Sequence, residues 1–141
     1  MSLRISDLFR PLPSAHYTII DTKADEFTSE LEQILDGVGG ELRVITEFSG
    51  MPRLRPREND TIIIRDVYAS FSDQKALLKV AYTSLANAAY IVIMEKKGVL
   101  DLNIIKDELS SAEFRAVNEI DLVDGYDLVM GKKMHMWGNG L

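Results

Sequence analysis

The chain has 141 residues, 46% of them hydrophobic, which is enough for one domain with a substantial core. Its 22 acidic and 16 basic side chains give a formal net charge of −6, which disfavours broad contact with nucleic acid. No cysteine is present, so disulfides, thiolate nucleophiles and thiolate-bound metals are excluded. Without a signal-peptide pattern or a run of about 18 apolar residues, the sequence predicts a cytoplasmic protein that makes no membrane contact.

The N-terminal part predicts an arm followed by a strand, a helix and a second strand. Residues 1–16 have only a short apolar spacing before two prolines, and we expect them to form an arm. Tyr17–Asp21 is a β-branched run that ends in an acid, which is typical of a strand. Thr22–Asp25 has the spacing of a capping box, so a helix is expected to begin there and to end at the glycines of 37–40. Leu42–Phe48 is predicted to be the second strand.

The middle of the chain predicts a connection, a buried strand and a helix. Ser49–Asp60 contains two prolines and no periodicity, which indicates an extended connection. Thr61–Val67 contains three consecutive isoleucines, as expected for a strand that is buried on both faces. Ser70 and Asp73 have capping-box spacing, and the apolar stripe after them predicts a helix to about Ala89.

The last third predicts a strand, a helix and a closing hairpin. Tyr90–Met94 is a buried strand by its composition, and Asp101 is placed to cap a helix. The dipeptide at 124–125, Asp-Gly, favours a tight turn between the extended segments Phe114–Val123 and Tyr126–Met130.

This order of elements predicts one α/β domain over residues 17–141, with helices on both faces of a sheet that is parallel until its antiparallel end. Ligands of such sheets bind at the carboxyl ends of the strands, where the strand order reverses. The polar residues expected there are Asp21 and Thr22 after the first strand, and Asp66 and Tyr68 after the third.

Three segments of the C-terminal half carry a family resemblance. They are a strand with its following loop at Asp60–Phe71, a helix end with a buried strand at Tyr82–Glu95, and a helix at Leu109–Phe114 that precedes the hairpin. In this order they resemble class I S-adenosylmethionine-dependent methyltransferases, over residues 60–133. The resemblance implies a Rossmann-like methyltransferase-type sheet that is mostly parallel with an antiparallel C-terminal hairpin. It also implies a fold reduced in size, because one strand and its helices have no counterpart around 49–59.

The resemblance also implies a cofactor and a set of site residues. S-adenosylmethionine would be held by Asp21, Thr22 and Glu47, since Glu47 lies at the position of the family's ribose-binding acid. Asp66 would orient the methyl acceptor, Tyr68 would stack on the adenine or wall the pocket, and we predict these two as the catalytic residues. The alternatives are that Glu47 is an exposed acid, that Asp66 caps a strand end, and that Tyr68 fills the edge of the core. No metal site is predicted.

The loop after the first strand departs from the family pattern. The family places a glycine-rich loop there, because bare backbone must pass close to the methionine part of the cofactor. Asp21–Asp25 holds no glycine. Two functions therefore stay open. The chain is either a methyltransferase-like domain with doubtful or lost activity, or a non-catalytic module for protein interaction or self-association, with a homodimer as one expected state.

Two further features could serve as contact surfaces. Arg53, Arg55 and Arg57 concentrate positive charge in one connection, which either binds an anionic ligand or partner or is simply solvated and paired with nearby acids. The only tryptophan, Trp137, lies in an apolar tail that is expected to cover the sheet or to pack against a second subunit.

Overall fold

The computed structural model describes residues 13–46, 50–120 and 125–134. In chain order its elements are β1 (His16–Ile20), α2 (Glu26–Asp36), β2 (Glu41–Ile45), β3 (Asn59–Arg65), the short 3-10 helix η1 (Tyr68–Ser70), α3 (Gln74–Ser84), β4 (Leu85–Lys96), α4 (Leu102–Ser111), β5 (Arg115–Ile120) and β6 (Tyr126–Lys132).

The strands of the described residues form one mixed sheet in the order β2-β1-β3-β4-β6-β5. β2, β1, β3 and β4 are parallel neighbours, whereas β6 pairs antiparallel with both β4 and β5. This arrangement confirms the predicted α/β class with its antiparallel end. The strand order reverses at β1, because β2 lies on one side of it and β3 on the other, so the carboxyl ends of β1 and β3 are adjacent as predicted.

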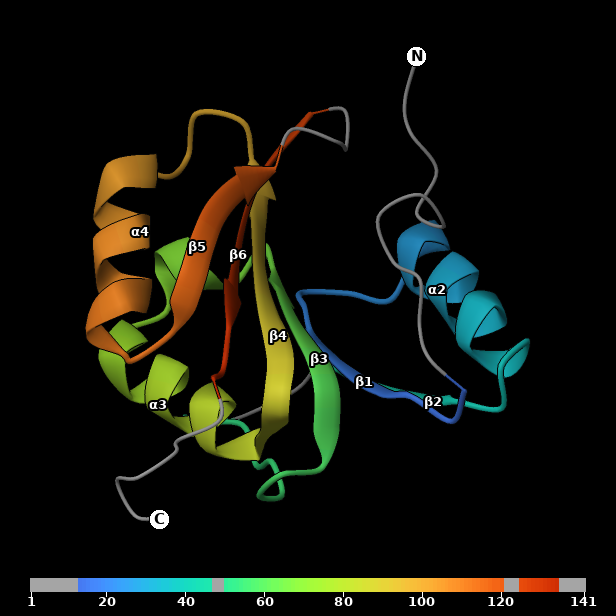
Figure 1. Cartoon of the computed structure of the whole chain (residues 1–141). Helices are drawn as coiled ribbons and strands as arrows, with labels where there is room; N and C mark the ends of the chain where they lie inside the picture. Colours follow the sequence, from blue (N-terminus) through green and yellow to red (C-terminus); the bar gives the residue numbers. More distant parts are fainter. Residues whose placement is uncertain (1–12, 47–49, 121–124, 135–141) are drawn as a thin grey trace, which may run out of the picture.

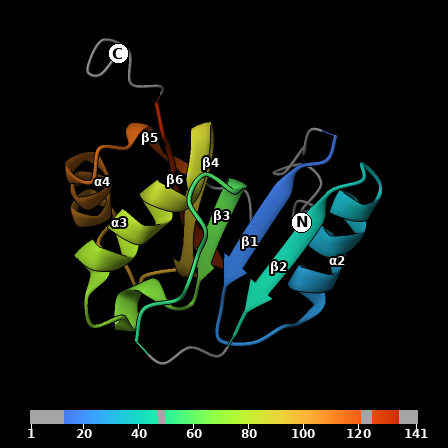
Figure 2. The same cartoon turned by 90° about the horizontal axis from the view of Figure 1, so that it is seen from below.

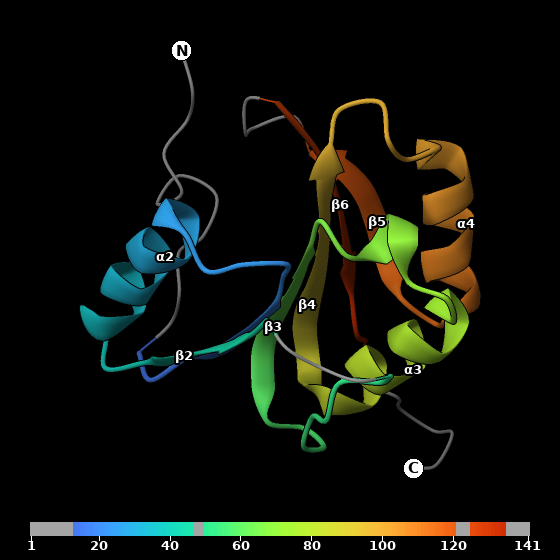
Figure 3. The same cartoon turned by 180° about the vertical axis from the view of Figure 1, so that it is seen from behind.

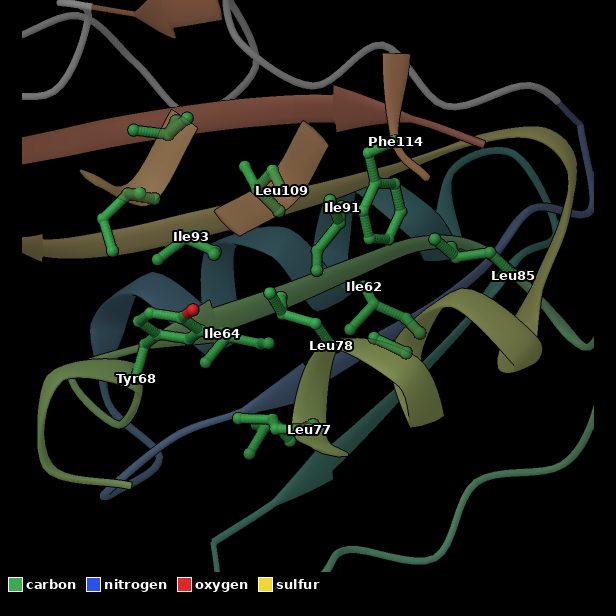
Figure 4. Packing of buried hydrophobic residues seen from close by; sticks show 14 of the residues in the cluster. Ile62, Ile64, Tyr68, Leu77, Leu78, Leu85, Ile91, Ile93, Leu109 and Phe114 are labelled. Carbon is green, nitrogen blue, oxygen red and sulfur yellow. The ribbon is translucent and has the colours of Figure 1, made fainter. Parts of the chain in front are cut away.

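Helices cover both faces of the sheet, as Figures 1 and 3 show. On one face, α3 and α4 pack against alternate side chains of the central strands, including Ile62 and Ile64 (Figure 4). On the other face, α2 packs against a second cluster that contains Ile63. All three isoleucines are 0% exposed, which confirms the prediction of a strand that is buried on both faces.

Both predicted helix starts were wrong by three residues. α2 is capped by Asp25, which exchanges hydrogen bonds with Thr28, and not by Thr22. α3 is capped by Asp73, whose side chain accepts a hydrogen bond from the Ala76 N–H at 3.0 Å. In each helix the cap is the aspartate three residues after the predicted threonine or serine, because a carboxylate bonds the free N–H groups and also complements the positive end of the helix dipole.

The prediction that α3 continues to Ala89 was also wrong, because the helix ends at Ser84 and β4 begins at once. The N–H of Ala88 donates to the carbonyl of Lys133 at 2.7 Å, and the N–H of Lys133 donates to the carbonyl of Ala89 at 2.8 Å. The ammonium of Lys133 additionally donates to the carbonyl of Leu85 at 2.8 Å. Pairing with the end of β6 therefore overrides the local helical periodicity.

Candidate functional site at the carboxyl edge of the sheet

Two cavities lie at the carboxyl ends of the parallel strands. The β2-side cavity has a volume of about 620 Å³ and is lined by Asp21, Thr22, Thr46, Gly50, Met51, Val67, Ser70, Phe71, Ser72 and Asp73. The β4-side cavity has a volume of about 430 Å³ and is lined by Thr22, Lys23, Asp25, Asp66, Glu95, Lys96, Val99 and Tyr126. Thr22 is the one lining residue that both cavities share, so both adjoin the loop after β1.

A buried ion network closes this loop against β3. The guanidinium of Arg65 contacts two carboxylates, with Nε 2.7 Å from Oδ2 of Asp21 and one terminal nitrogen 2.8 Å from Oδ2 of Asp25. The side chains of Arg65 and Asp21 are 4% and 0% exposed. The guanidinium also lies over the ring of Phe27, 4.6 Å from its centre. The network thus joins β3, the end of β1 and the start of α2.

The same two carboxylates accept hydrogen bonds from the N–H groups of the loop. Oδ1 of Asp21 accepts from the N–H of Thr22 at 2.7 Å and from that of Lys23 at 3.4 Å. Oδ1 of Asp25 accepts from the N–H of Phe27 at 3.0 Å. Burial tends to raise the pKa of Asp25, but its hydrogen bond to Arg65 and the charge of Arg65 hold that pKa below its ordinary value. The N–H groups of Thr22, Lys23 and Phe27 are therefore already engaged by carboxylates of the protein itself.

Asp66 and Glu95 face the β4-side cavity from the ends of β3 and β4. Asp66 has a φ of +56°, a conformation that carries strain in a residue with a Cβ. Its Oδ2 accepts a hydrogen bond from the hydroxyl of Tyr126 at 3.2 Å, and Oε2 of Glu95 accepts one from the N–H of Ala69 at 3.0 Å. Burial, together with the nearby charge of Asp66, raises the pKa of Glu95.

Tyr68 lies in the core and lines neither cavity. It is 0% exposed, and Figure 4 shows its ring near Ile64 and Leu77. Its hydroxyl donates to Oε1 of Glu108 at 3.0 Å, and burial together with this contact raises the pKa of the hydroxyl. Of the two readings that the sequence left open for Tyr68, this position corresponds to filling the core.

The remaining predicted residues divide between the two cavities. Asp21 lines the β2-side cavity, Asp66 lines the β4-side cavity, and Thr22 lines both. Glu47 lies outside the described residues. Sequence reasoning missed Arg65 and Glu95, although a charged residue at the end of a buried apolar strand is a signal for a polar contact.

The structure says little about the two predicted contact surfaces, the connection at 53–57 and the tail with Trp137. All three arginines of the 53–57 connection are exposed, and Nε of Arg55 lies 3.8 Å from Oε2 of Glu58. Trp137 lies outside the described residues.

Within the described part of the chain, no helix is long and apolar enough to cross a membrane.

Comparison with solved structures gives the class of fold. A methyltransferase dependent on S-adenosylmethionine (SAM) from Aquifex aeolicus matches 91% of this chain and 87% of its own, with a TM-score of 0.75 and 14% identity. Phosphoethanolamine N-methyltransferase 2 of Haemonchus contortus, in complex with phosphomonomethylethanolamine and S-adenosylhomocysteine, matches 93% of this chain with a TM-score of 0.66 and 9% identity. Human N-acetylserotonin methyltransferase, in complex with SAM, matches 84% with a TM-score of 0.60 and 14% identity.

This chain has the class I methyltransferase fold in reduced form. It spans 52% and 48% of the length of the Haemonchus and human proteins, whereas it spans most of the Aquifex protein. No protein-family model matches the sequence, and no curated protein matches it either.

Proposed function

We propose that this chain is a methyltransferase-fold domain that has lost SAM-dependent methyl transfer and acts as a non-catalytic interaction module. The observation that carries the proposal is the closure of the loop after β1 by Arg65, Asp21 and Asp25. A fold of this class binds its ligand at this edge of the sheet, so the state of this loop decides whether the ligand can be held.

The residues of the loop do not fit S-adenosylmethionine. Every position from Thr22 to Asp25 carries a Cβ, where close approach of a ligand to the backbone needs glycine. The N–H groups of Thr22 and Lys23 are bonded to the carboxylate of Asp21, so they are not available to the carboxylate of the cofactor.

The β2-side cavity supports a second candidate function, the binding of a nucleoside without methyl transfer. Its volume of about 620 Å³ is within the range of small-molecule sites. Met51, Val67 and Phe71 provide apolar wall, as an adenine ring requires, and Ser70 and Ser72 provide hydroxyls. Thr22, the first residue of the closed loop after β1, also lines this cavity.

Isothermal titration calorimetry with S-adenosylmethionine, S-adenosylhomocysteine and adenosine tests both candidates. We expect no saturable heat from the first two ligands at millimolar concentration. Adenosine binding alone, abolished in a Val67→Trp variant that fills the cavity, would support the second candidate. Saturable binding of S-adenosylmethionine, or its conversion to S-adenosylhomocysteine in the presence of any acceptor, would overturn the proposed loss of activity.

A further inference from the structure

The outer edge of β2 has backbone groups that pair with no strand in the described part of the chain. β2 ends the sheet and pairs only with β1 among the described residues, in a parallel register without a shift (Figure 2). The N–H of Glu41 donates to Ala15 and the carbonyl of Ile45 accepts from Asp21, so the odd-numbered residues of β2 face β1. Because backbone groups alternate along a strand, the N–H and C=O of Leu42 and Val44 point away from the sheet.

The opposite edge of the sheet is interrupted by a register shift, whereas β2 has none. β5, at the other end, has a register shift between Arg115 and Asn118, and Ala116 within it has a φ of +52°. Such a bulge disrupts the edge and discourages pairing with another chain. β2 has no bulge, proline or lysine, so of the usual means of blocking an edge it has only its short length and the charges of Glu41 and Arg43.

The charges of β2 are complementary to a second copy of the same strand. Glu41 and Arg43 are exposed, lie on the same face of the strand, and flank Leu42. Arg43 makes no ion pair with any residue that the structure describes, and Glu41 has only a contact to Nδ1 of His16 at 3.4 Å. We propose that β2 pairs antiparallel with β2 of a second copy, about a two-fold axis at Leu42. This deepens the proposed interaction role and rests on it.

The backbone geometry of β2 suits this register. Leu42 would oppose Leu42 of the second copy and exchange two hydrogen bonds with it, because its groups point outward. The outward N–H of Val44 would reach the carbonyl of Gly40 in the second copy, whose own N–H is already bonded to Leu35. The non-hydrogen-bonded positions would then place Glu41 of each copy directly opposite Arg43 of the other, at the closest cross-strand distance.

Other registers lose this charge pairing. An axis at Arg43 would place two arginines opposite each other, and an axis at Val44 would place Arg43 opposite Ile45. The carboxylates of Glu32 and Asp36 line a cavity together with the start of β2, and they oppose the approach of an identical copy. We therefore expect a dimer that dissociates on dilution.

Analytical ultracentrifugation of the full chain with charge-swap variants tests the register. Arg43→Glu and Glu41→Arg each place like charges opposite each other, twice per dimer, and each should raise the dissociation constant at least about tenfold. The double variant Glu41→Arg with Arg43→Glu restores both pairs and should restore the dimer. Arg115→Glu, the same charge change at the opposite edge, should have no effect.

Three results would overturn this interface. They are a wild-type chain that stays monomeric at the highest concentration, a dimer that none of the β2 variants weakens, and a double variant no better than the single ones. Circular dichroism of each variant shows whether it is folded. Failure here is distinguishable from failure of the proposed loss of methyl transfer, because the calorimetric titration is independent of oligomeric state.

Discussion

Replacing Arg65 by Met tests whether the buried ion network holds the carboxyl edge together. Met retains much of the length of the side chain and its apolar contact with Phe27, but it leaves the carboxylate of Asp21 without its cation. Asp21 is 0% exposed in its side chain, so water cannot replace the guanidinium without opening the loop.

The expected loss follows from the burial of the pair. Removing one partner of a buried ion pair typically destabilises a protein by about 3–5 kcal/mol. Asp21 keeps its hydrogen bonds from Thr22 and Lys23, so we expect the lower end of that range, about 3 kcal/mol. For a domain of this size that corresponds to a fall in Tm of about 10 °C. Adding Asp21→Asn to Arg65→Met removes the stranded charge, retains an acceptor, and should recover at least about half of the loss.

Chemical denaturation across a range of pH measures these effects. The pKa of Asp25 is held below its ordinary value of 3.8, so the unfolded state binds the proton more readily. The stability that Asp25 provides is therefore present above that pH and is lost as the pH falls through its folded pKa. The difference between wild type and Arg65→Met should shrink over the same acidic range, since a protonated Asp25 no longer attracts the cation. A loss below about 1 kcal/mol at neutral pH, or one independent of pH, would refute this account.

Three other substitutions test separate parts of the structure. Gly40→Ala would place a Cβ 2.5 Å from the carbonyl oxygen of Ala15 and should lower stability by about 1–3 kcal/mol in thermal denaturation. Burial raises the pKa of Glu95, so the contribution of Glu95 to stability is fully present below pH 4.5 and is lost as the pH rises through the folded pKa. Glu95→Gln should therefore stabilise the protein at neutral pH by up to about 1 kcal/mol, and should not stabilise it below pH 4.5. Tyr68→Phe removes the hydrogen bond to Glu108 and should lower the free energy of unfolding by about 1–2 kcal/mol, without changing the ligand titrations.

The fold was largely predictable because its strongest signals are local. Three consecutive isoleucines indicated a strand buried on both faces, and Asp101 was correctly predicted as the cap of α4. The start of β4 was not predictable, since Leu85–Ala89 continues the apolar stripe of α3 and is extended because it pairs with Asn59 of β3 and with Lys133. A tertiary contact over almost fifty positions leaves no local pattern.

The candidate site was less predictable than the fold. Strand ends predicted that Asp21, Thr22 and Asp66 lie at the carboxyl edge of the sheet, where they line the two cavities. The interactions of Asp21 at the end of β1 depend on a residue 44 positions away, because the guanidinium of Arg65 donates a hydrogen bond to its carboxylate. The glycine-free loop predicted a departure from the family pattern, but not the contacts of Arg65 with Asp21 and Asp25.

This chain departs from a full methyltransferase sheet in two ways: one strand with its helices is missing among the described residues, and the loop after β1 has no glycine. Both departures fall on the half of the sheet that contains β1 and β2. That half has one helix, α2, and its outer strand has no further neighbour in the described chain, so fewer contacts hold it to the rest of the sheet. Arg65 joins β3 to the end of β1 and to the start of α2 through its contacts with Asp21 and Asp25. A loop that must admit a cofactor cannot also be held closed by these contacts. The proposed loss of the ligand would therefore free Asp21 and Asp25 to stabilise the reduced sheet, and a second copy would supply the neighbour that β2 lacks among the described residues.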